Sequence, residues 1–166
     1  MNNLVDSIIS KMILYFGKDV RRINHALKVY SLAKNIGAIE GLSGEEKIIL
    51  DAAAVLHDIG IKESEKKYNT SMGKYQEIEG PAVARELLKE YNLDEKLLER
   101  ICYLIGNHHT YTKIDGLDFQ ILVEADFLVN IFEDNMDKKQ ITTVKEKYFK
   151  TKTGIDYVNS VYLDSI

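Results

Sequence analysis

Apolar residues recur every three to four positions along most of this chain, a spacing typical of α-helices that bury one face. One Pro and 10 Gly leave little room for long linkers. We therefore predict an all-α fold, a helical bundle that forms a single domain over residues 1–166. The predicted helices span residues 3–16, 19–36, 43–59, 81–91, 93–107, 118–133, 137–149 and 154–164.

Short local signals predict several of the helix boundaries. Ser43 and Glu46 match a capping box, in which each side chain satisfies a backbone amide at the start of a helix. Gly37 suits the end of the second predicted helix, and Pro81 suits the first turn of the fourth. Residues 61–79 are rich in Lys and Glu, so we predict a long polar loop there that acts as a lid or a substrate-binding loop.

Composition narrows the range of partners and locations. The formal net charge is -4, and Lys and Arg are scattered among acidic residues, so no basic stripe indicates nucleic-acid binding. No apolar run approaches the ~18 residues of a membrane span. The only cysteine, Cys102, has no partner for an internal disulfide and is expected to pack in the core, which fits a cytoplasmic protein. The sequence leaves the oligomeric state open.

Four ionisable side chains lie on predicted apolar faces, namely His25, the adjacent pair His57 and Asp58, and Asp126. A carboxylate that is buried without a partner is costly, so it usually pairs with a cation, takes up a proton or binds a metal ion. Two imidazoles and two carboxylates that meet at one point suit a divalent metal ion.

The order of these residues resembles the HD superfamily of metal-dependent phosphohydrolases. Residues 25–29 (HALKV) are similar to the first histidine motif of that family, residues 56–60 (LHDIG) to its signature pair, and residues 124–126 (EAD) to its final aspartate. The resemblance implies an all-helical bundle that binds one divalent ion. This ion can be Mn, Fe, Co, Ni, Mg or Zn, and the sequence does not distinguish among them. The implied metal ligands are His25, His57, Asp58 and Asp126.

A second histidine motif, residues 105–109 (IGNHH), is similar to one that holds further metal or substrate ligands in part of the family. His108 continues an apolar helical face, and we predict that it binds phosphate, ligates a second metal ion or protonates the leaving oxygen. His109 is interpreted as a polar residue at a helix end. A histidine that such relatives carry upstream is missing here. Two readings of Glu77 and Glu79 stay open: one of them replaces that histidine as a ligand of a second metal, or they are solvated residues that stabilise the start of a helix.

Lys28 follows His25 by three residues and therefore lies on the same side of its helix. A protonated amine has no lone pair for a metal ion but binds phosphate oxygens well. We therefore predict that Lys28 contacts the phosphate of the substrate.

These features predict a metal-dependent phosphohydrolase that acts on a nucleotide or another small phosphorylated metabolite. The metal ion would activate a water molecule, and Asp58 would both ligate the ion and orient that water. Two alternatives stay open, namely a metal- and nucleotide-binding module without turnover and a di-iron oxygenase of the same fold.

Overall fold

The described part of the chain is helical throughout, which confirms the predicted all-α class. The computed structural model describes residues 2–163, with side chains from residue 4 onward. Within these residues there are nine α-helices, two short 3-10 helices and no strand. The elements are α1 (Asn2–Phe16), α2 (Val20–Ile39), α3 (Gly44–Leu56), α4 (Ile61–Tyr68), α5 (Gly73–Leu88), η1 (Lys89–Tyr91), α6 (Glu95–Ile105), η2 (Tyr111–Lys113), α7 (Leu117–Glu133), α8 (Lys138–Tyr148) and α9 (Lys152–Tyr162).

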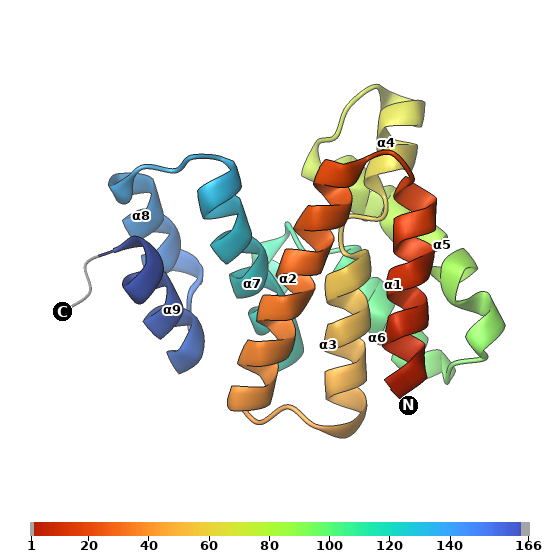
Figure 1. Ribbon diagram of the computed structural model, residues 1–166, viewed down its shortest axis with the longest axis horizontal. Coiled ribbons are helices and arrows are strands. Elements are labelled where there is room, and N and C mark those ends of the chain that lie inside the picture. Colours follow the sequence, from red (N-terminus) through yellow and green to blue (C-terminus); the bar gives the residue numbers. More distant parts are fainter. Residues whose placement is uncertain (1, 164–166) are drawn as a thin grey trace.

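Helices α2, α3 and α7 form the centre of the bundle. Helix α2 packs along both α3 and α7, and α3 also contacts α6 (Figure 1). Every residue of α3 from Ile49 to Leu56 is buried, including three consecutive alanines that let neighbouring helices approach closely. Helices α1 and α5 lie on one side of this centre, whereas α8 and α9 pack against α7 on the other (Figure 1).

The predicted polar loop over residues 61–79 is wrong, because most of that segment is helical. Helix α4 begins at Ile61, and α5 begins at Gly73, eight residues before Pro81. In α4 only Ile61 and Ser64 are buried, so its Lys and Glu content reflects an exposed helix rather than a loop. Asn69 ends α4 in the left-handed conformation, with φ 54°.

Several predicted helix ends also differ from the structure. Helix α2 continues past Gly37 to Ile39, and Gly37 packs closely on α3, since a Cβ there would lie 2.9 Å from the end of the Leu50 side chain. Ser43 does occupy the N-cap position of α3, but its side chain makes no capping hydrogen bond. Helix α3 ends at Leu56, so the His-Asp pair follows the helix instead of lying in its last turn.

The turn that carries the His-Asp pair is held against α5 by a close approach between two glycines. A Cβ on Gly60 would overlap the carbonyl oxygen of Gln76 and would lie 2.6 Å from the backbone nitrogen of Gly80. Only glycine therefore allows this contact, which places α5 beside residues 57 and 58. None of the described helices has both the length and the apolar character needed to cross a membrane.

We expect Gly60→Ala to lower the free energy of unfolding by about 3 kcal/mol, because the added methyl group meets backbone atoms that cannot rotate away. The matched control is Gly44→Ala, where a Cβ meets open space and only the positive φ of 55° is unfavourable, at about 1 kcal/mol. Urea unfolding of both variants measures the difference. Equal stability of the two variants would contradict the proposed contact.

Candidate metal centre

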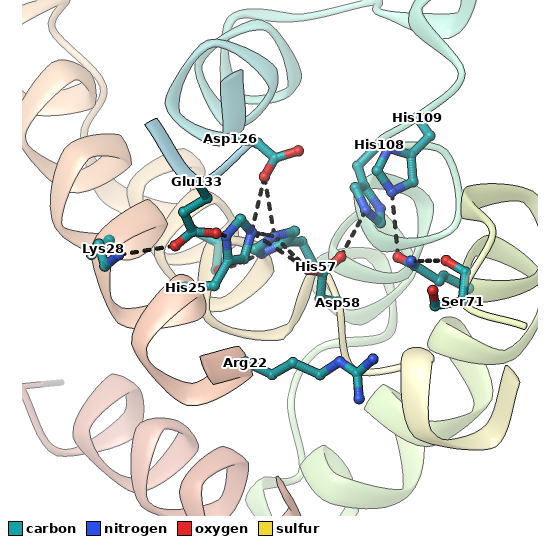
Figure 2. A network of polar contacts seen from close by, with 12 residues as sticks. Arg22, His25, Lys28, His57, Asp58, Ser71, His108, His109, Asp126 and Glu133 are labelled. Atoms are coloured by element: carbon teal, nitrogen blue, oxygen red, sulfur yellow. Dashed lines mark hydrogen bonds and ion pairs between the residues drawn. The ribbon is translucent and has the colours of Figure 1, made fainter. Parts of the chain in front are cut away.

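The structure brings His25, His57, Asp58 and Asp126 together at one point, as Figure 2 shows. The Nε2 atom of His25 lies 3.1 Å from Nε2 of His57 and 3.1 Å from Oδ1 of Asp126. One oxygen of Asp58, Oδ2, lies 3.4 Å from His25 Nε2 and 3.5 Å from His57 Nε2. Ligand atoms bound at ~2.1 Å to a common ion are separated by ~3.0–3.5 Å, so the spacing fits a shared metal ion.

Two helices and one turn supply these side chains. His25 lies in the second turn of α2, Asp126 lies in the middle of α7, and the His-Asp pair follows the end of α3. Both α2 and α7 turn apolar faces toward α3, so a polar residue on those faces points at the same place. The carbonyl end of α3 adds partial negative charge that favours a bound cation.

In both His25 and His57, the ring nitrogen that points away from the centre has a hydrogen-bond partner. Nδ1 of His57 lies 2.8 Å from the carbonyl oxygen of Ala54, and Nδ1 of His25 lies 2.8 Å from Oε2 of Glu133. Because a carbonyl oxygen only accepts, His57 donates its Nδ1 proton there and turns the lone pair of Nε2 toward the centre. This is the arrangement of a metal-binding imidazole with an outer hydrogen-bond partner.

The electrostatics of the centre require a compensating cation. Burial lowers the pKa of His57, but the carboxylates of Asp58 and Asp126 outweigh it and raise that pKa to about 9. Burial likewise raises the pKa of Asp126, but hydrogen bonds from His25 and His57 hold the pKa well below its usual value. The carboxylates are thus stable as anions only beside protons on the imidazoles or beside a metal ion that replaces those protons.

A second group of possible ligands shares Asp58 with the first. Ligand atoms of Asp58, His108 and His109 lie within 4.8 Å of one another. Nδ1 of His108 lies 2.8 Å from the carbonyl oxygen of Ile105, three residues earlier, which repeats the arrangement of His57 and Ala54. Its Nε2 atom is buried, lies 3.3 Å from Oδ1 of Asp58 and makes no aligned hydrogen bond. All four histidines of the chain therefore meet at this site.

The two glutamates predicted as ligands of a second metal have other partners. Glu77 accepts hydrogen bonds from the backbone amide of His109 and from the hydroxyl of Thr110. Glu79 accepts hydrogen bonds from Lys67 and Tyr68. Neither glutamate belongs to the clusters of possible ligands found among the described residues.

Gln76 is the residue of that segment which reaches the site. Its Oε1 atom lies 3.3 Å from Nε2 of His109, and its amide nitrogen donates to the carbonyl oxygen of Ser71. His109 does follow the end of α6, as interpreted from the sequence, but its side chain contacts Gln76 and lies in the cluster with Asp58 and His108. Burial and the neighbouring His108 lower the pKa of His109 to about 4, so His109 is neutral at pH 7.

Glu133 joins the site although the sequence analysis did not select it. Its Oε2 atom contacts His25, and its Oε1 atom accepts a hydrogen bond of 2.9 Å from Lys28 (Figure 2). The sequence feature that could have indicated Glu133 is its position seven residues after Asp126, two helical turns along the same face of α7. Cys102, in contrast, is buried and outside the site, as expected.

A pocket of about 290 Å³ opens beside His25 and Asp58. Two arginines line it. Arg22 is held by Asp19 at 2.6 Å and Glu65 at 2.5 Å, whereas Arg21 makes no ion pair within residues 2–163. The other residues that line this pocket are Asp19, Ile61, Ser71, Gln76, Asn130, Glu133 and Asp134.

We expect Glu133→Gln to weaken binding of Mn²⁺ to the purified protein by about tenfold or more, because the hydrogen bond to His25 loses its charge. The control is Asp134→Asn, which removes the same charge from the next residue and from the lining of the same pocket. Competition against a metal-binding dye measures both affinities. If the two variants bind Mn²⁺ equally well, Glu133 does not support His25.

The comparisons with known proteins agree with this geometry. Residues 22–146 match the HD domain family. A solved structure, described as a predicted HD superfamily hydrolase from an uncultured Thermotogales bacterium, has the same fold with a TM-score of 0.66 and 22% sequence identity, covering 93% of this chain and 83% of that one. No curated protein matches the chain. The match to the HD domain family covers most of the chain and includes every residue of the metal centre, so this protein belongs to that family.

Proposed function

We propose that this protein is a metal-dependent phosphohydrolase that acts on a nucleotide or another small phosphorylated metabolite. The strongest support is the placement of Asp58, whose two oxygens face different histidines. Oδ2 lies 3.4 Å from Nε2 of His25, and Oδ1 lies 3.3 Å from Nε2 of His108. One oxygen can thus hold a metal ion while the other meets a water molecule or a second ion beside His108.

His25, His57, Asp58 and Asp126 would hold a divalent ion, which supplies Lewis acidity and activates water. Asp58 is a poor proton acceptor, because the imidazoles of His57 and His108 outweigh burial and hold its pKa below the usual value. Its role is therefore to orient the attacking water. His108 keeps a bare lone pair at Nε2, which can bind a second ion or, once protonated, donate to the leaving oxygen.

The pocket beside the centre supplies cations for a phosphoryl group. Arg21 is the better placed of its two arginines, because Asp19 and Glu65 already neutralise Arg22. Lys28 stays a predicted phosphate contact. Its side chain is half exposed and paired with Glu133, so Lys28 can also act on His25 through that glutamate.

The proposal is tested by phosphate release from a panel of nucleotides and small phosphorylated metabolites. Activity should disappear with a chelator and return with Mn, Co, Ni or Mg. Asp58→Ala should lose both activity and bound metal, whereas Asp51→Ala, which alters a buried acid of α3 outside the centre, should retain the metal. No turnover by a metal-loaded protein would favour a binding module, and oxygen uptake with an iron-loaded protein would favour an oxygenase.

We expect Arg21→Met to lower kcat/KM by about a hundredfold at unchanged metal content, because a charge-assisted contact to phosphate is worth ~2–3 kcal/mol. Lys18→Met, at an exposed position outside the pocket, is the control and should leave kcat/KM unchanged. An Arg21→Met enzyme with normal kinetics would remove Arg21 from the phosphate site.

Lys28→Met separates the two roles open to that lysine. A fall in kcat/KM at unchanged metal content is the result expected for a phosphate contact. A parallel fall in metal affinity, like that expected for Glu133→Gln, would instead assign Lys28 to the support of His25.

A further inference from the structure

A second and larger pocket lies behind His109, between the segment that follows α6 and the end of α8. Its volume is about 620 Å³. It shares no lining residue with the arginine-lined pocket beside His25. The residues that line it are His109, Thr110, Tyr111, Thr112, Ile114, Gln120, Lys147, Tyr148 and Lys150.

The lining of this pocket carries positive charge and no negative charge. Lys147 and Lys150 are exposed, line the pocket and form no ion pair with the described residues. No carboxylate lines it, although the chain carries 26 acidic residues and only 22 Lys and Arg. Two unpaired amines in an otherwise acidic protein favour an anionic ligand.

Aromatic rings form one wall of the pocket. The rings of Tyr111 and Tyr148 have centroids 4.4 Å apart, and Tyr148 is stacked on Phe127 at 5.1 Å with an interplanar angle of 10°. Tyr111 and Tyr148 are half-buried and both line the pocket, and each ring is held by its aromatic neighbours. Such a wall suits a flat aromatic group such as a nucleobase, because an aromatic side chain can stack on the face of any base.

The pocket also borders the metal centre. His109 lines the pocket on one side, and its ring lies against His108 with centroids 4.0 Å apart on the other. A ligand in this pocket therefore contacts a residue that also belongs to the cluster of Asp58 and His108.

We propose that this pocket binds a nucleotide, with the base against Tyr111 and Tyr148 and the phosphate near Lys147 and Lys150. A ligand with an aromatic ring and a separate anionic group matches both the tyrosines and the lysines. A sugar phosphate would leave the tyrosines without a partner, and a nucleoside would leave the lysines without one. The inference concerns binding alone and does not depend on hydrolysis by the metal centre.

The test is isothermal titration of the full chain with AMP, GMP, CMP and UMP, with a chelator present so that no metal ion mediates binding. We expect at least one of these nucleotides to bind, and its nucleoside and ribose 5-phosphate to bind at least tenfold more weakly. No binding by any of the four would overturn the proposal. Equal binding of ribose 5-phosphate would also overturn it, because phosphate alone would then suffice.

Two lysine variants locate the site. Lys147→Gln combined with Lys150→Gln should weaken nucleotide binding at least tenfold, while Lys96→Gln combined with Lys139→Gln changes the net charge equally at exposed positions outside the pocket and should have no effect. Equal weakening in both double variants would reduce the effect to net charge and refute the pocket.

A further variant tests the aromatic wall. Tyr148→Leu should weaken binding of both nucleotide and nucleoside, because it removes stacking rather than charge. Unchanged nucleoside binding in a folded Tyr148→Leu protein, as judged by circular dichroism, would exclude the base from this wall.

Discussion

Burial of the carboxylates of Asp58 and Asp126 beside two imidazoles is the interaction on which this site depends. An unpaired buried carboxylate is strongly destabilising, so the fold must keep His25 and His57 within about 3.5 Å of these oxygens. The same constraint explains the outer partners of the imidazoles, since Ala54 and Glu133 hold the rings with Nε2 turned inward. A metal ion bound at this point would replace the protons that the imidazoles otherwise need.

The helical bundle meets this constraint by bringing the ends of two helices together. Residues 57 and 108 each follow a helix, α3 and α6, and each hydrogen-bonds to the carbonyl group three residues earlier. Both rings therefore leave their helix in the same way and face Asp58 from different sides. The close contact of Gly60 with α5 then brings Gln76 to the edge of the site, where it contacts His109.

Basic side chains lie in both pockets that flank the acidic centre. The centre itself is acidic, but Arg21 and Arg22 line the pocket on one side, and Lys147 and Lys150 line the pocket behind His109. A metal ion held at the centre would attract phosphate as well. The proposed function rests on Asp58 and its histidines, whereas the proposed nucleotide pocket rests on two lysines and two tyrosines, so each proposal can fail without the other.

Much of the fold, and the four residues that meet at the candidate metal centre, could be predicted from the sequence alone. Helical periodicity identified the all-α class, and polar residues on apolar faces identified His25, His57, Asp58 and Asp126, because burial of such groups has few physical solutions. The helix at residues 61–68 was missed because an exposed helix and a polar loop have the same composition. Only the tertiary structure decided that Glu133 supports His25, that Gln76 rather than Glu77 or Glu79 reaches His109, and that two pockets flank the centre. These features depend on how separate helices pack, and spacing along one helix does not specify contacts between helices.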